Sequence, residues 1–288
     1  MKFSPHSDHG KGVIMHINQV WAAYFSGSDT TKTIVTTIAQ EIAQALGVPC
    51  AELNFTPPQA REEHYTFAPT DLVICGTPVI AGRVPNVLLP FLSHGFTGNH
   101  ALAVPVVLFG NRNYDDALME LREILEADGL RTVAGGAFVG EHSFSTILGA
   151  GRPDGADLDK AKEFAQAIAE KVIKLDALPT EPVAVNGCLP LRPYYTPRDR
   201  HGKPINILKV KPKTRDTCTH CGLCAQVCPM GSIDPDDVTH YTGICIKCCA
   251  CVKKCPVGAK YYDDEGYLYH QHELEEMYQR RAEPEVFL

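Results

Sequence analysis

The sequence lacks any long uninterrupted run of apolar residues. A membrane-spanning helix needs about 20 consecutive apolar residues, whereas the best run here, Ala101 to Phe109, is short and contains Pro105. An excess of basic residues is also missing, because 27 Lys and Arg stand against 34 Asp and Glu, giving a net charge of -7. The composition predicts no membrane span and argues against a nucleic-acid surface, which requires a basic footprint.

Two further signals are missing. Residues 1–11 are polar and contain no apolar segment like that of a signal peptide, so we expect residues 1–14 to be a disordered leader and the protein to be cytoplasmic. No G-x-G-x-x-G fingerprint for a nicotinamide dinucleotide is present either. Its absence disfavours direct oxidation of NAD(P)H.

Cysteine, in contrast, is abundant, and nine of the twelve cysteines lie between residues 218 and 255. Without an export signal, such crowding indicates metal ligation rather than disulfides. The pattern C-x2-C-x2-C-x3-C-P occurs twice without a gap. The first copy comprises Cys218, Cys221, Cys224, Cys228 and Pro229, and the second comprises Cys245, Cys248, Cys251, Cys255 and Pro256.

This repeated pattern is typical of ferredoxins with two [4Fe–4S] clusters, where the fourth cysteine of each run ligates the other cluster. The rule assigns the first cluster to Cys218, Cys221, Cys224 and Cys255. It assigns the second cluster to Cys245, Cys248, Cys251 and Cys228. A zinc site or a disulfide knot is the alternative, although zinc sites commonly use two separated C-x2-C pairs. Cys249 is out of frame; we interpret it as a spare thiol, and an exchange with Cys248 stays open.

Residues 15–178 alternate short apolar runs with helical patterns, which predicts an α/β fold with a doubly wound parallel sheet. The expected strands are Gln19–Phe25, Asp71–Cys75, Ala103–Phe109 and Thr132–Val139. The expected helices are Thr31–Leu46, Tyr114–Asp128 and Leu158–Leu175.

The remainder of the chain has a different composition. Residues 179–212 contain seven prolines and are expected to be a semi-rigid connector. Residues 213–262 are poor in large apolar side chains, so this small α+β domain should fold around its metal. Residues 263–288 form an acidic tail, expected to be solvated, with a short helix at Glu273–Arg281.

A hydroxyl-rich loop follows the first predicted strand and leads into a helix. It comprises Ser26, Gly27, Ser28, Asp29, Thr30 and Thr31. Backbone N–H groups, a helix N-terminus and side-chain hydroxyls together suit a phosphate group. The alternative is an ordinary capped helix start, where the same residue types are common.

With these features the chain resembles the flavodoxin–ferredoxin fusion family of anaerobes. In flavodoxins the first loop reads Ser/Thr-x-Thr-Gly-x-Thr and binds the phosphate of FMN; Ser26, Ser28 and Thr31 match its hydroxyl positions. The loops that flank the flavin ring in that family correspond to residues 76–85 and 110–116. The resemblance implies that FMN is contacted by Thr77, Pro78, Gly110, Asn111 and Tyr114, with Tyr114 stacked on the ring.

Two positions depart from the flavodoxin pattern. Asp29 stands where the phosphate loop normally has glycine, and its carboxylate is unfavourable beside a phosphate dianion. Either Asp29 weakens FMN binding, or it turns outward as a helix cap. Ile80 stands where an aromatic ring is expected to cover the flavin.

The charged residues near these segments each allow two interpretations. Glu141 and His142 are interpreted as a solvated pair, with a proton relay as the alternative. Lys247, Lys253 and Lys254 flank the second cysteine run and are interpreted as surface lysines, with steering of an acidic redox partner as the alternative.

The predicted function is an electron-transfer iron–sulfur flavoprotein that shuttles electrons between FMN and two [4Fe–4S] clusters. Its expected partners are redox proteins, and no catalytic residue is assigned. Two alternatives stay open: a flavin-dependent reductase of a small substrate fed by the clusters, and a ferredoxin with a cofactor-free docking domain.

Overall fold

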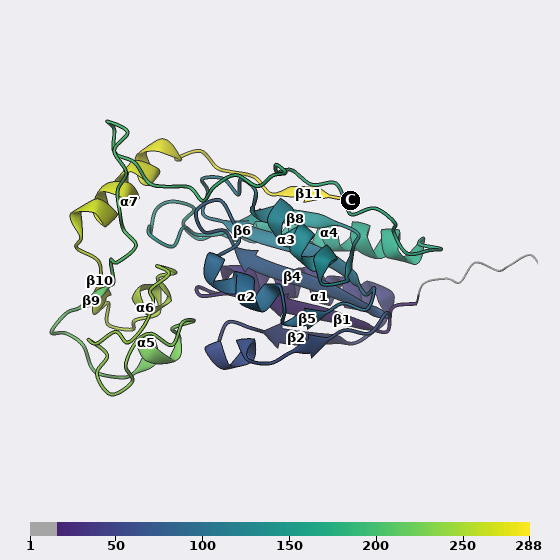
Figure 1. Cartoon of the computed structure of the whole chain (residues 1–288), viewed down its shortest axis with the longest axis horizontal. Coiled ribbons are helices and arrows are strands. Elements are labelled where there is room, and N and C mark those ends of the chain that lie inside the picture. Colours follow the sequence, from purple (N-terminus) through teal and green to yellow (C-terminus); the bar gives the residue numbers. More distant parts are fainter. Residues whose placement is uncertain (1–15) are drawn as a thin grey trace, which may run out of the picture.

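A central parallel sheet organises the N-terminal half of the chain (Figure 1). The computed structural model describes residues 16–288, so the expected leader lies outside the described residues. The parallel strands are β1 (Gln19–Tyr24), β2 (Cys50–Asn54), β4 (Asp71–Pro78), β6 (Leu102–Phe109) and β8 (Gly135–Val139). They lie in the order β2-β1-β4-β6-β8, which is the flavodoxin-like order of doubly wound sheets. The predicted fold class is confirmed.

Helices cover both faces of this sheet, as amphipathic patterns require. On one face lie α1 (Thr30–Leu46) and α4 (Gly155–Ile173), whose apolar sides share one buried cluster. On the other face lie α3 (Ala117–Ala127) and the short α2 (Leu89–Leu92), within a second cluster. The smaller elements here are β3 (Tyr65–Thr66), β5 (Phe96–Thr97), η1 (Pro58–Arg61) and η2 (Asn86–Leu88).

Some boundaries differ from the sequence prediction. The expected strand Thr132–Val139 is two strands, β7 (Arg131–Thr132) and β8, which pair with β6 through residues 131–132 and 136–139. Helix α3 begins at Ala117 rather than Tyr114, since Asp115 has a left-handed φ of 44°. Strand β2, with mostly exposed side chains, had too weak an apolar pattern to be predicted.

The proline-rich segment 179–212 runs along the upper edge of the domain in Figure 1 and packs against it. Arg192 forms an ion pair with the fully buried Asp116 and donates its backbone N–H to the same carboxylate at 2.8 Å. The hydroxyl of Tyr194 donates to the backbone oxygen of Val84 at 2.9 Å. These contacts hold the segment on the domain.

The cysteine-rich segment forms a small module beside the sheet (Figure 1). Its elements are β9 (Lys213–Thr214), α5 (Leu223–Gln226), α6 (Ala250–Lys253) and β10 (Lys260–Tyr261), with β9 and β10 antiparallel. Ile233, Val238 and Cys251 form its own buried cluster. Such a small apolar cluster is consistent with a module that needs bound metal to fold.

The C-terminal segment departs most from the prediction. The helix expected at Glu273–Arg281 is α7 (Glu265–Met277), which begins after Asp264, whose side chain accepts the N–H of Tyr267. The chain then returns to the first domain, where β11 (Glu285–Phe287) pairs antiparallel with β8. The tail therefore covers the open edge of the sheet, which periodicity alone does not reveal.

Candidate functional site: a cavity between the first domain and the cysteine module

The two cysteine runs fold into loops of the same conformation. In the first, His220 and Gly222 have positive φ values of 53° and 74°; in the second, Lys247 and Cys249 have 56° and 57°. Gly222 precedes α5 as Cys249 precedes α6. Cys249 therefore corresponds to a glycine of the first run, which leaves Cys248 as the residue equivalent to Cys221.

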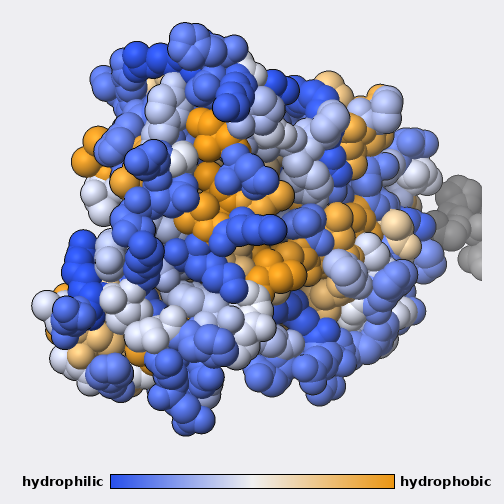
Figure 2. All heavy atoms as spheres, turned by 60° about the vertical axis from the view of Figure 1, so that its left-hand side comes forward, coloured by the Kyte–Doolittle hydropathy of each residue, from blue (hydrophilic) through white to orange (hydrophobic). Residues whose placement is uncertain are grey.

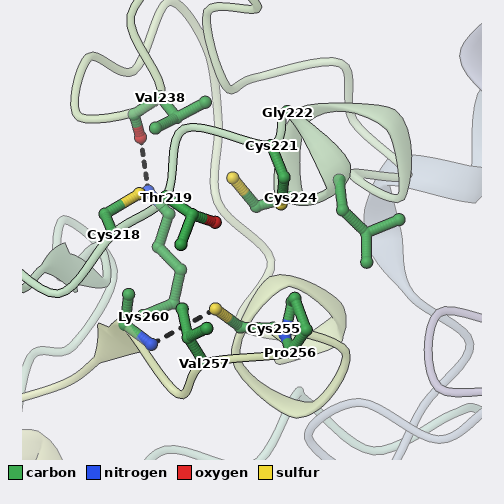
Figure 3. Close-up of a pocket in the computed structure, with 12 residues that line it drawn as sticks. Cys218, Thr219, Cys221, Gly222, Cys224, Val238, Cys255, Pro256, Val257 and Lys260 are labelled. Atoms are coloured by element: carbon green, nitrogen blue, oxygen red, sulfur yellow. Dashed lines mark hydrogen bonds between the residues drawn. The ribbon is translucent and has the colours of Figure 1, made fainter.

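The first cysteine cavity brings together cysteines from both runs. Its cysteine lining is Cys218, Cys221, Cys224 and Cys255. Figure 3 shows these four side chains around one space, with Cys255 approaching from the second run. The backbone N–H of Ala259 donates to the Cys255 sulfur at 3.2 Å. Although burial opposes it, N–H groups of residues 257–260 lower the pKa of the Cys255 thiol, which favours the thiolate form that metals bind.

The second cysteine cavity has the complementary lining, consisting of Cys228, Cys245, Cys248, Cys249 and Cys251. Cys228 comes from the first run, and its sulfur accepts the N–H of Ser232 at 3.4 Å. Cys249 is 3% exposed, and its sulfur lies 3.5 Å from the hydroxyl of Tyr267. Each cavity is thus lined by four in-frame cysteines, three from one run and the fourth from the other.

Within residues 16–288, no three His, Cys, Asp or Glu side chains group closely enough to hold one metal ion. A [4Fe–4S] cluster is different in geometry, because its four thiolates bind four separate irons at its corners. Cysteines that stand around a cavity fit such a cluster.

A third, larger cavity of about 460 Å³ lies between the first domain and the cysteine module. This volume is within the range of small-molecule and cofactor sites. From the first domain it is lined by residues of the loops that follow β1, β4, β6 and β8. From the module it is lined by residues 244–248, including Cys245 and Cys248. The carboxyl ends of the parallel strands therefore face the second cysteine cavity.

Figure 2 looks onto this side of the molecule, where apolar residues gather between polar surfaces. Leu208, 80% exposed, and Ile244, 64% exposed, both belong to the cavity lining. Large apolar side chains with such exposure at a concave site are typical of a ligand-binding opening.

The hydroxyl-rich loop lies at the cavity and keeps free hydrogen-bonding groups there. Ser28, Thr30 and Thr31 line the cavity, and their hydroxyls bond to no other described residue. The Thr31 side chain is only 1% exposed. Its methyl group packs close to Gly76 of β4, where a β-carbon would lie 3.2 Å away. Hydroxyls that line a cavity and have no protein partner are available to a ligand, so these residues fit a polar group such as a phosphate.

Asp29 lies in this loop but does not cap the helix. Its φ of 67° is the left-handed conformation that the usual glycine would adopt, and its side chain makes no capping bond. Instead, Ser26 accepts the N–H of Lys32 at 3.1 Å. The Asp29 carboxylate pairs with Lys254 of the cysteine module at 2.9 Å. The interpretation of Asp29 as a helix cap is therefore wrong, because its carboxylate turns toward a lysine instead.

Several predicted cofactor contacts lie outside the cavity lining, and one of them, the buried Thr77 hydroxyl, has no hydrogen-bond partner within the described residues. Gly27, Pro78 and Gly110 line the cavity, whereas Ser26, Asp29, Thr77, Asn111 and Tyr114 do not. The Asn111 amide donates to the backbone oxygens of Tyr278 and Arg280, both at 2.7 Å. Tyr114 packs on Phe109 and its hydroxyl lies 2.5 Å from Glu285. The ring-stacking position predicted for Tyr114 is therefore not at the cavity, because its side chain holds the C-terminal segment.

The cavity is also lined by aromatic side chains that were not predicted from the sequence. Tyr195 of the proline-rich segment stacks on His270 of α7 at 6.0 Å, and Phe144 meets the same histidine edge-on at 6.0 Å. All three residues line the cavity, as does Ile80. No local pattern marks them, since they come from three distant segments.

Two histidines at the cavity are held neutral. Burial, followed by the charges of His270, Lys253 and Arg112, lowers the pKa of His142 to about 3. Burial, followed by Arg112, lowers the pKa of His270 to about 4. The Nδ1 of His142 accepts the N–H of Phe144 at 3.1 Å. The buried Nδ1 of His270 has no hydrogen-bond partner within the described residues and lies 3.8 Å from a carboxylate oxygen of Glu273. The interpretation of His142 as part of a solvated pair is wrong.

The three lysines beside the second run all form bonds within the protein, Lys254 through its ion pair with Asp29. Lys247 is 8% exposed and donates to the backbone oxygens of Leu208 and Cys245. Lys253 pairs with Glu141 at 2.5 Å and donates to the backbone oxygen of His142 at 2.7 Å. Their ammonium groups thus bind the module to its surroundings, so the interpretation as surface lysines is wrong for them.

Comparison with known proteins identifies the first cysteine run. A 4Fe-4S binding domain model matches residues 212–234, which supports [4Fe–4S] binding by this segment. No curated protein matches the sequence significantly. No helix of residues 16–288 is long and apolar enough to cross a bilayer.

Among solved structures, the chain is similar to a flavodoxin from the domain Archaea, with 15% identity and a TM-score of 0.40 over 54% of this chain and 98% of that one. It is similar to Flavodoxin 2 from Bacillus cereus, with 19% identity and a TM-score of 0.38 over 54% and 99%. It is also similar to the Megasphaera elsdenii flavodoxin, with 16% identity and a TM-score of 0.36 over 54% of this chain and 99% of that one.

The strand order of the sheet and the matched 4Fe-4S segment confirm the two parts of the predicted resemblance. This chain joins a flavodoxin-like α/β domain to a C-terminal ferredoxin-type iron–sulfur segment.

Proposed function

We propose that this protein is an electron-transfer iron–sulfur flavoprotein, with FMN in the large cavity and a [4Fe–4S] cluster in each cysteine cavity. The observation that carries the proposal is the lining of the large cavity. Cys245 and Cys248 of the second cluster site line it together with the hydroxyl-rich loop. FMN bound there would lie beside the second cluster, and the ligand exchange would keep the two clusters close.

FMN accepts two electrons and releases them singly, so the arrangement couples a two-electron donor to one-electron carriers. The chain positions the cofactors and tunes their potentials through hydrogen bonds and burial. Ser28, Thr30 and Thr31 would bind the phosphate, while Phe144 and Tyr195 supply aromatic surface for the ring. Thiolate ligation leaves no open iron site for a substrate, which favours electron transfer at the clusters.

Anaerobically purified and reconstituted protein should contain about eight irons, about eight acid-labile sulfides and about one FMN per chain. Reduction of the bound flavin should be followed by reduction of the clusters in stopped-flow absorbance. Protein that retains its clusters but takes up no flavin would reject the flavin half of the proposal. An iron content of about four per chain would reject one of the two proposed clusters.

A flavin-dependent reductase is the second candidate, and the two neutral histidines at the cavity favour it. A neutral imidazole can donate a hydrogen bond to a carbonyl or nitro oxygen without carrying charge. Steady-state turnover of quinones or nitro compounds, with a chemically reduced ferredoxin as donor, would support this candidate. Electron transfer between the cofactors without such turnover would favour the electron-carrier function over the reductase.

A further inference from the structure

We propose that Lys254, supplied by the iron–sulfur module, neutralises Asp29 and thereby allows the hydroxyl-rich loop to bind a phosphate monoester. The inference rests on the proposed function and adds a residue to its phosphate site. Lys254 is a positioning residue here, because it acts through Asp29 rather than lining the cavity itself.

The need for such a cation follows from the loop. Asp29 lies between Ser28 and Thr30, which both line the cavity. A carboxylate this close to a dianion repels it, by an amount that depends on how well both charges are screened. Asp29 adopts the left-handed φ of 67° that glycine would adopt there, and aspartate tolerates this conformation better than most residues. Its charge is therefore the main obstacle to phosphate binding.

The structure provides the opposite charge from the module. The Lys254 ammonium lies 2.9 Å from one carboxylate oxygen of Asp29 and 3.0 Å from the other. Lys254 directly follows α6, the helix that begins after Cys249. A β-carbon on Gly27 would lie only 3.1 Å from the Cβ of Cys248, so the loop and the module are in contact. Phosphate binding by the loop thereby depends on the position of the second cysteine run.

Other charges near the loop do not replace this pair. Lys32 is exposed on the first turn of α1 and makes no ion pair with Asp29. Lys253 is committed to Glu141 and two backbone oxygens. With side chains 29% and 60% exposed, the Lys254–Asp29 pair contributes little to folding, so its variants should fold.

The test compares FMN with riboflavin, which carries the same ring but no phosphate. Full-length, cluster-loaded protein freed of flavin is titrated with each, following the quenching of flavin fluorescence. Lys254→Ala should weaken FMN binding about fivefold to tenfold and leave riboflavin binding unchanged. The loss should shrink as salt is added. The matched control is Lys209→Ala, which removes an exposed lysine that makes no side-chain bond within the described residues.

Asp29→Asn, which tolerates the same left-handed backbone, should tighten FMN binding. In the double variant Asp29→Asn/Lys254→Ala, affinity should return to within about threefold of the original protein. If the original protein binds FMN but Lys254→Ala binds it equally well, or loses FMN and riboflavin equally, only the present inference is overturned. If the original protein binds no FMN, both this inference and the flavin half of the proposed function are overturned.

Discussion

Gly27 of the hydroxyl-rich loop and Cys248 of the second cysteine run lie in direct contact. A β-carbon on Gly27 would stand 3.1 Å from the Cβ and 3.3 Å from the sulfur of Cys248. A segment proposed to bind phosphate thus touches a residue proposed to bind iron, across more than 200 positions of sequence. A side chain at position 27 would crowd this approach.

Gly27→Ala should therefore disturb the second cluster. Its methyl group must displace the Cys248 loop by a few tenths of an ångström, at a cost of about 1–2 kcal/mol. The electron paramagnetic resonance (EPR) spectrum of the reduced protein should change for the second cluster and not for the first. Gly155→Ala is the control, since its β-carbon would meet no atom within 4 Å. Identical spectra for both variants would contradict the contact.

The exchange of fourth ligands predicts which cluster each cysteine serves. Cys255→Ala should damage the first cluster, because Cys255 lines that cavity, whereas Cys228→Ala should damage the second. Iron analysis and EPR of the two variants would separate the clusters by their signals. The exposed Cys188 lies outside both cavities, and Cys188→Ala should keep both signals. Selective loss of the second cluster in Cys255→Ala would refute the assignment.

Cys249 should be dispensable for cluster binding. It occupies the left-handed position that Gly222 holds in the first run, so Cys249→Gly removes a strained residue. The gain, about 1 kcal/mol, is offset by the loss of a buried side chain. The variant should retain about eight irons, whereas Cys248→Ala should lose the second cluster. The opposite result would identify Cys249 as the ligand.

The neutral histidines predict a loss of stability in acid. His142 and His270 have lower pKa values folded than unfolded, so the unfolded chain binds protons more readily below pH 6.5. The free energy of unfolding should fall by about 1 kcal/mol per pH unit for each histidine, down to about pH 4 for His270. In anaerobic thermal melts at a series of pH values, the stability of His270→Phe should fall less steeply with acidification than that of the original protein. The variant His201→Gln, at an exposed position, should behave like the original protein. Parallel curves for all three proteins would exclude this cause.

The proline-rich segment should contribute to stability. The Asp116 carboxylate is fully buried, and its pairing with Arg192 lowers the pKa of Asp116 to about 2. Arg192→Ala leaves that charge with only backbone donors, at a cost of about 1–3 kcal/mol. Denaturant unfolding should detect this change, with Arg198→Ala as control. An unchanged midpoint would indicate that the segment acts only as a tether.

The sequence by itself determined the features that depend on neighbouring residues. Cysteines three and four positions apart must share a loop, so each cysteine run was predictable as a local unit, and the lining of each cavity by a fourth cysteine from the other run agrees with the ferredoxin rule. The same holds for α1, β4 and β6, whose apolar periodicity is a local property. The bounds of the helix expected at Glu273–Arg281 were wrong, because an acidic tail offers little periodicity and the start of α7 depends on Asp264.

The cavity itself was decided by the tertiary structure. Tyr195, Phe144 and His270 meet there from segments that have no common pattern, and Tyr114 is drawn away by Glu285. Asp29 looked unfavourable in a phosphate loop as long as its partner, 225 positions away, was unknown. A charge pair depends on distance in space, and only the folded chain brings Lys254 to Asp29.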